Sequence, residues 1–212
     1  MENDPKKRIL NVATELFAQK GYAAVGVREI ANEADVNLSM ISYYYGGKVG
    51  LLKSITEEFF NEFKKTFLGS FHPEAEFEVN TFQLGRSIVE LFRTKTSLTK
   101  IGLIELPNEV PEITAFKTSK ITEMFTWLGS FIKLLGVDHE KDWEFIAMIG
   151  PGLLNLMFSH FLMLPLVKGI SVHEFDDNYY DMYSIMMGKI ILSGLPTAVD
   201  YYKKNSKNNK KK

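Results

Sequence analysis

Residues 37–48, NLSMISYYYGGK, place three adjacent tyrosines, two serines and a lysine in one short segment. Tyrosine and serine hydroxyls can donate hydrogen bonds to phosphate oxygens, and a lysine ammonium adds a positive charge. The tyrosine rings also offer apolar surface to a flat or methylated group. This chemistry requires an element that presents the side chains to solvent, and the neighbouring sequence determines whether such an element exists.

Hydrophobic spacing predicts three helices around this segment. Apolar residues recur at helical intervals across residues 6–21, KKRILNVATELFAQKG, with Pro5 near the start and Gly21 as a stop. A second, short helix is predicted over residues 27–34. The third is predicted over residues 38–45, with Asn37 as its N-cap and the glycines at 46 and 47 ending it.

A long helix followed by two short helices across a three-residue turn is the arrangement of a helix-turn-helix, whose last helix enters the major groove of DNA. Ile41 and Tyr45 share one face of the third helix and are predicted to be core. Tyr43 and Tyr44 are predicted to face DNA, where a hydroxyl can meet a phosphate and a ring can meet a thymine methyl. The alternative is that the tyrosines only plug an ordinary helical domain.

These segments resemble the N-terminal DNA-binding domain of TetR-type transcriptional regulators. The resemblance covers about residues 8–59, through ILNVATELFAQKGY, VREIANEADV, the aromatic end of the third helix, and a lysine followed by LL. Departures are Gly26 where the family usually has threonine, Asp35 where it has glycine, and Val49 where it has an acidic residue. The DNA-contacting residues that the resemblance implies are Arg28, Asn37, Ser39, Met40, Ser42, Tyr43, Tyr44 and Lys48.

Within that set, the residue types predict two roles. Lys48 and Tyr44 are assigned to phosphates, whereas Ser39, Met40 and Tyr43 are assigned to base edges. Because the third helix carries no basic residue, we expect modest affinity for non-specific DNA.

The rest of the chain is predicted to be helical, with about nine helices in an all-α fold. The expected organisation is a helix-turn-helix domain at residues 1–48, a helical-bundle domain for ligand binding and dimerisation at 49–202, and a lysine-rich disordered tail at 203–212. With 45% hydrophobic and 24% charged residues, the composition is that of a globular protein. The N-terminus has no apolar run of a secretory signal, so we expect a cytoplasmic protein.

Residues 145–167 contain no Asp, Glu, Lys or Arg, and this run is long enough to span a bilayer. A membrane-anchored helical protein is therefore one alternative. Pro151, Asn155, Ser159, His160 and Pro165 argue against it. We expect instead that the run is buried, in a homodimer interface shared with the helix over residues 174–195, and that Gly150–Gly152 kink or interrupt it.

Signals of catalysis are weak. The chain has no cysteine, and its four histidines lack metal-ligand spacing. The acidic residues of IELPNEVPEI are expected to be solvated, and His160 is expected to be a hydrogen-bonded core residue. We therefore expect no enzyme activity, metal or cofactor. A helical enzyme with a DNA-binding head is the second alternative.

Aromatic and methionine side chains along the later helices predict a pocket for an apolar or aromatic small molecule. The functional expectation is a ligand-responsive repressor that binds a palindromic operator as a homodimer and is released by this effector. The predicted pocket residues are Phe92, Phe116, Met124, Trp127, Met157 and Phe161.

Overall fold

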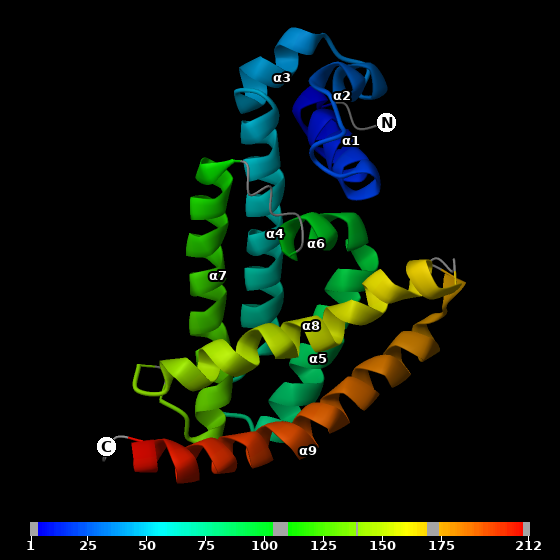
Figure 1. The fold of residues 1–212 in the computed structure, drawn as a ribbon. Helices are drawn as coiled ribbons and strands as arrows, with labels where there is room; N and C mark the ends of the chain where they lie inside the picture. Colours follow the sequence, from blue (N-terminus) through cyan, green and yellow to red (C-terminus); the bar gives the residue numbers. More distant parts are fainter. Residues whose placement is uncertain (1–3, 104–109, 139, 169–173, 210–212) are drawn as a thin grey trace. The chain divides into compact units, whose positions relative to one another are not determined.

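A computed structural model describes residues 4–103, 110–138, 140–168 and 174–209, apart from the side chains of residues 162, 164–168 and 206–209. These residues form nine α-helices and a short 3₁₀ helix and contain no strand, which confirms the predicted all-α fold (Figure 1). Glu105, Glu109, His139 and His173 lie outside the described residues.

The chain divides into two compact units. The first extends to Phe63 and also includes Lys95–Ile121, and the second comprises Lys64–Thr94 and everything from Thr122. Helices α4 (Lys48–Ser70) and α7 (Pro111–Ile132) contribute residues to both. The boundary predicted at residue 48 separates a DNA-binding domain from a ligand-binding domain, whereas these two units are defined by their compactness. The predicted boundary stays a prediction.

In the first unit, α1 (Pro5–Lys20) packs against α2 (Val27–Glu33), α3 (Leu38–Tyr45) and α6 (Thr96–Leu103). Ile9, Phe17, Ile30 and Ile41 are buried there because each lies on the apolar face of its helix. Helix α6 approaches α4 closely, since a Cβ added at Gly102 would meet the ring of Phe59. The three helices predicted around residues 5–45 are confirmed.

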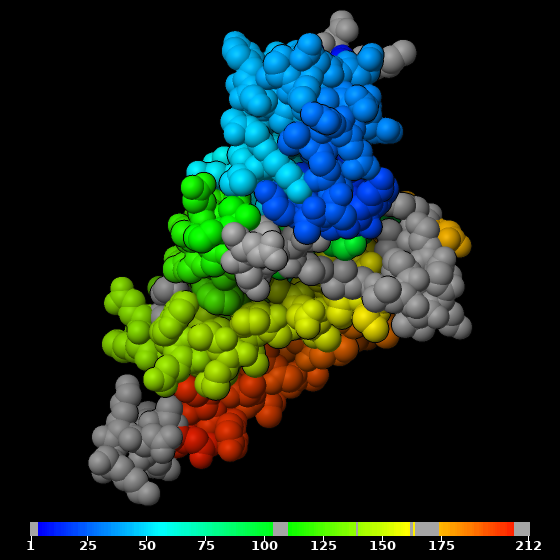
Figure 2. Space-filling view, turned by 45° about the horizontal axis from the view of Figure 1, so that its top comes forward, coloured from blue at the N-terminus to red at the C-terminus, as the bar shows by residue number. Residues whose placement is uncertain are grey.

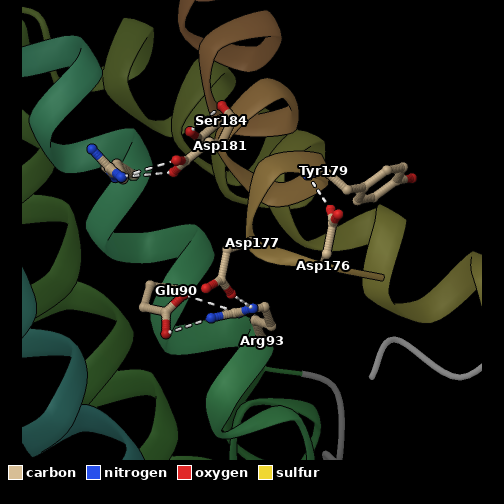
Figure 3. A network of polar contacts seen from close by, with 8 residues as sticks. Glu90, Arg93, Asp176, Asp177, Tyr179, Asp181 and Ser184 are labelled. Atoms are coloured by element: carbon tan, nitrogen blue, oxygen red, sulfur yellow. Dashed lines mark hydrogen bonds and ion pairs between the residues drawn. The ribbon is translucent and has the colours of Figure 1, made fainter. Parts of the chain in front are cut away.

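In the second unit, α5 (Phe77–Thr94) packs against α8 (Trp143–Lys168) and α9 (Asp177–Asn209). The α5–α9 approach is close, because a Cβ at Gly188 would lie 2.8 Å from the Phe82 ring. Two ion pairs also join the two helices: Arg93 pairs with Asp177, and Arg86 pairs with Asp181. Within α5, Glu90 pairs with Arg93 as well (Figure 3). The 3₁₀ helix η1 (Lys133–Leu135) follows α7.

Two stretches differ from the sequence expectation. Helix α8 continues through Pro151, where Gly150 lies against α7 so closely that a Cβ would be 2.8 Å from Leu128. The helix is therefore not interrupted at the proline, and the expected kink stays a prediction. Helix α9 continues through Asn209, so residues 203–209, expected to be disordered, extend an existing helix without a new nucleation step. Residues 210–212 lie outside the described residues.

One helical segment of the described chain, Asp177–Asn205, is long and apolar enough to cross a membrane by length and composition. About a third of its most apolar window, 33%, is buried inside the chain. Core helices of soluble proteins pass the same test, so this single segment is weak support for the membrane alternative.

Candidate nucleic-acid interface

Helix α3 begins and ends at the residues that its sequence predicts. The Asn37 Oδ1 atom accepts a hydrogen bond from the Ser39 backbone N–H at 2.9 Å, which caps the N-terminus. Gly46 ends the helix in the left-handed conformation with φ 70°, and its N–H donates to the Ser42 carbonyl. Because Asn37 Oδ1 also accepts from the Ser39 hydroxyl at 2.8 Å, the cap holds the first turn rigidly.

The two faces of α3 differ sharply in exposure. Ile41 is buried, and the Tyr45 hydroxyl donates to the Lys6 carbonyl of α1 at 2.7 Å. On the opposite face Tyr43 is 82% exposed, Ser39 and Ser42 are also exposed, and Met40 and Tyr44 are half-buried. The surface made by residues 5–48 is the blue to light-blue part of Figure 2.

The three tyrosines form a chain of edge contacts. The ring centroids of Tyr43 and Tyr44 are 5.0 Å apart, and those of Tyr44 and Tyr45 are 6.5 Å apart. Burial first, and then the Asp4 and Glu58 carboxylates, raise the pKa of Tyr45 to about 12. The anchored third tyrosine therefore supports the second, and the second supports the exposed first.

Arg8 holds the turn between α2 and α3, a role that sequence reasoning missed. Its Nε donates to the Ala34 carbonyl and its guanidinium also donates to the Asp35 carbonyl, both at 3.2 Å. Asp35 has φ 50°, a left-handed conformation that aspartate adopts more readily than most residues. The partners lie 26 and 27 residues from Arg8, so no local pattern could have identified them.

Lys48 begins α4 after Gly46 and Gly47, both of which have positive φ. Its ammonium lies 4.2 Å from the centroid of the Tyr22 ring and 3.5 Å from the Ala23 carbonyl. Burial lowers the pKa of Lys48, because its charge is partly withdrawn from water. Arg28 is exposed on α2. All eight predicted DNA-contacting residues belong to the first compact unit.

Leu38 is an exposed apolar residue that the sequence analysis did not select. It is the first residue of α3 and its exposed fraction is 42%. Its exposure next to Ser39 adds an apolar group to the solvent-facing side of the helix. The signal available from sequence was only its position directly after the N-cap.

Comparison with known proteins agrees with this geometry. The family model for "Bacterial regulatory proteins, tetR family" matches residues 9–55, which include most of α1, all of α2 and α3, and the start of α4. Residues 9–55 form a TetR-family domain. The predicted resemblance to TetR-type regulators is thereby confirmed for this part of the chain, which matches a family of DNA-binding, helix-turn-helix transcription regulators.

Curated relatives match the same end of the chain. A probable HTH-type transcriptional regulator of Bacillus subtilis, YttP, is 46% identical over 66 residues, which are 31% of this chain and 32% of that protein. The regulator HbdR of Aromatoleum is 31% identical over 72 residues, 32% of this chain and 31% of that protein. The chain thus spans about a third of the length of the curated relatives it matches.

Solved structures extend the likeness to the whole fold. FadR of Bacillus halodurans, a fatty acid degradation regulator, has a TM-score of 0.70 at 17% identity and covers 92% of this chain and 98% of its own. FadR of Bacillus subtilis, solved in complex with stearoyl-CoA, has a TM-score of 0.66 at 17% identity, covering 89% and 98%. At these identities the likeness shows the fold alone, and that fold is TetR-like.

The predicted pocket residues fall into separate groups. Phe92 and Phe161 are buried together in the second unit with ring centroids 6.1 Å apart, and Met157 is buried on the same helix as Phe161. The ring centroids of Trp127 and Phe67 are 6.3 Å apart, and Met124 is buried one turn before Trp127 on α7. Phe116 lies in the first unit, where Lys53 and Lys120 lie over its ring. The pocket assignment stays a prediction.

His160 lies in an aromatic cluster of the second unit. Its ring stacks on Tyr183 at 4.5 Å, and its Nε2 atom is 3.4 Å from the Tyr179 hydroxyl. Burial lowers its pKa, and Tyr183 in turn donates to the Met157 carbonyl at 2.9 Å. These contacts are those of a histidine on α8 that packs against tyrosines of α9.

Proposed function

We propose that this chain is a cytoplasmic, DNA-binding transcriptional repressor that acts as a homodimer on a palindromic operator and is released by a largely apolar effector. The observation that carries the proposal is the outer face of α3. Ser39, Ser42 and Tyr43 are exposed there while Ile41 and Tyr45 anchor the helix from behind. A short helix held in this way, with hydroxyls and a ring directed outward, suits base and phosphate contacts in a major groove.

Dimerisation is supported by an unpartnered apolar stripe on α9. Met182, Ile185, Met186 and Ile190 recur at helical spacing, and between 47% and 53% of each residue is exposed. On α8, Met148 is 66% exposed as well. Burying such a surface against a second copy is favourable by about 25 cal/mol per Å² before the costs of association. We therefore assign the interface to α9 together with the exposed side of α8.

An apolar effector is supported by the aromatic and methionine side chains of the second unit. The similar structure of Bacillus subtilis FadR contains stearoyl-CoA. We extend that ligand class to this chain as a proposal: the effector carries a long apolar chain, and it shifts the dimer away from the DNA-binding conformation by binding the other conformation more tightly. Adding stearoyl-CoA should release bound DNA, whereas coenzyme A alone should not. Equal release by both would contradict an apolar effector.

The proposed function is tested by selecting bound duplexes from a pool of random DNA. A dimer with two-fold symmetry should enrich a near-palindrome whose half-sites are about one helical turn, 34–36 Å, or a multiple of it apart. Enrichment of a single half-site would contradict the dimer. A failure to enrich any sequence, with the chain folded, would contradict DNA recognition itself.

A further inference from the structure

The side chain of Lys48 contacts the ring of Tyr22, a residue that is not among those assigned to DNA contact. The Lys48 ammonium lies over the Tyr22 ring at 4.2 Å from its centroid, within the range of a cation–π interaction. The Tyr22 ring is itself held by an edge contact with the buried Phe17, whose ring centroid is 5.3 Å away. Gly21, with φ 81°, ends α1, and Tyr22 is the next residue of the loop. The ring is therefore a fixed support.

The contact leaves the positive charge of Lys48 available to an anion. A ring face and the Ala23 carbonyl are its neighbours, and neither carries a formal negative charge. Burial is the only cause that shifts the pKa of Lys48. Within the described part of the chain, no carboxylate forms an ion pair with this ammonium. The charge is thus placed without being neutralised.

The surroundings of the ammonium also leave room for a large anion. The exposed residues of the loop beside it, Ala23, Ala24 and Gly26, are small and carry no long side chain. A free lysine side chain has many rotamers, and binding a phosphate would restrict them. A ring that already restricts the side chain reduces the entropy that is lost when the phosphate binds.

We infer that Tyr22 is a positioning residue: its ring holds the Lys48 ammonium over the α1–α2 loop, ready for a DNA phosphate, and makes no base contact of its own. The inference rests on the proposed function, because it names the partner of a lysine assigned to the DNA backbone. Tyr22 therefore sets the strength of DNA binding through Lys48. It should not affect which sequence is preferred.

The test is a double-mutant cycle on the full chain with a fluorescent random-sequence duplex. Tyr22→Leu removes the aromatic face, Tyr22→Phe keeps it, and Lys48→Ala removes the charge. We expect Tyr22→Leu to weaken binding about two- to fivefold, in the range of a partly exposed cation–π contact, and Tyr22→Phe to bind like the unaltered chain. In the Lys48→Ala background, Tyr22→Leu should have no further effect.

The salt dependence separates positioning from removal of the charge. Lys48→Ala should reduce the slope of log K against log salt by about 0.9 for each phosphate that the lysine no longer neutralises. Tyr22→Leu should lower the affinity and leave the slope unchanged, because the charge remains. The inference is overturned if Tyr22→Leu weakens binding equally with and without Lys48, if it leaves binding unaltered, or if Tyr22→Phe is as weak as Tyr22→Leu.

A measurement without DNA distinguishes this inference from the proposed function. In the NMR spectrum of the unbound chain, the Lys48 ε-methylene protons should be shifted upfield by the Tyr22 ring and should return to ordinary values in Tyr22→Leu. Ordinary shifts in the unaltered chain would overturn the inference even if DNA binds. If the upfield shift is present and the unaltered chain binds no duplex, the proposed function fails while the contact stands.

Discussion

Three consecutive tyrosines have three different environments because the residues of a helix point in successive directions about 100° apart. Tyr43 faces solvent, Tyr44 is half-buried, and the Tyr45 hydroxyl donates a hydrogen bond to the backbone of α1. The same residue type therefore supplies a surface group, a support and an anchor. Substitutions at these positions should have different effects on DNA binding and on stability.

The proposed phosphate contacts should affect all DNA sequences alike. Lys48→Ala and Tyr44→Phe should weaken binding to specific and random duplexes by the same factor, since phosphate contacts position the protein without reading bases. Ser39→Ala, in contrast, should change the preference at one base pair of each half-site. Affinities for a panel of single-base variants measure both effects. A changed base preference in Lys48→Ala would contradict its assigned role.

Tyr45 makes the stability of the chain depend on alkaline pH. An unfolded tyrosine ionises near pH 10, whereas the pKa of Tyr45 in the folded chain is about 12. Between these values the unfolded chain binds fewer protons, so the free energy of unfolding falls as pH rises. Tyr45→Phe should cost about 1 kcal/mol at pH 7 because its hydrogen bond is removed, and the deficit should shrink above pH 10.

Urea unfolding at a series of pH values measures this dependence. Tyr201→Phe is the matched control, because Tyr201 is 71% exposed. The control should unfold like the unaltered chain throughout. A constant difference between Tyr45→Phe and the unaltered chain from pH 7 to pH 12 would show that the Tyr45 hydroxyl is not held as described.

At the scale of elements, the junction between α3 and α4 depends on close backbone contact. A Cβ added at Gly50, the third residue of α4, would lie 1.7 Å from the Tyr45 carbonyl oxygen. Gly50→Ala must therefore move α3 relative to α4. We expect it to destabilise the first unit by about 1–3 kcal/mol and to weaken DNA binding.

Gly69→Ala provides the control in the same helix. No atom lies within 4 Å of a Cβ added there, so alanine should be tolerated and should stabilise α4 by up to about 1 kcal/mol. Thermal unfolding and duplex binding of both variants make the comparison. If Gly50→Ala behaved like Gly69→Ala, the close approach of the two helices would be wrong.

Local signals predicted this part of the fold well because caps and turns are encoded by neighbouring residues. Asn37 and Gly46 set the bounds of α3, and both were readable in the sequence. The partners of Arg8 and the separation of Phe116 from the other pocket residues were not readable. These depend on which helices meet in space, and the spacing of apolar residues does not specify that.

At the scale of the whole molecule, the run over residues 145–167 has two roles that its apolar sequence could not separate. Phe145, Ile146, Phe158 and Phe161 are buried within their own unit, whereas Met148 and Met163 are exposed. A charge at Phe158 would therefore disrupt the core that contains Phe92, 5.1 Å away, rather than probe a dimer interface. The exposed residues of α9 are the better test of dimerisation.

Met186→Glu should dissociate the proposed dimer. In a homodimer the carboxylate would be buried without a partner, and the cost of several kcal/mol corresponds to at least a hundredfold weaker association. Val79→Glu, at a 44% exposed apolar residue on α5, is the matched control and should leave the dimer intact. Sedimentation equilibrium measures both. Unchanged association in Met186→Glu would move the interface away from the α9 stripe.

The central claim is that two copies of α3 read DNA through their outer faces, and Tyr43 tests it most directly. Duplexes should be selected from random DNA with the unaltered chain and with Tyr43→Ala. Tyr43 is 82% exposed, so its removal should affect folding little. We predict a near-palindrome for the unaltered chain and, for Tyr43→Ala, a loss of preference at two symmetry-related positions with the rest of the site retained. Identical selected sites, or a change at positions unrelated by symmetry, would contradict this claim.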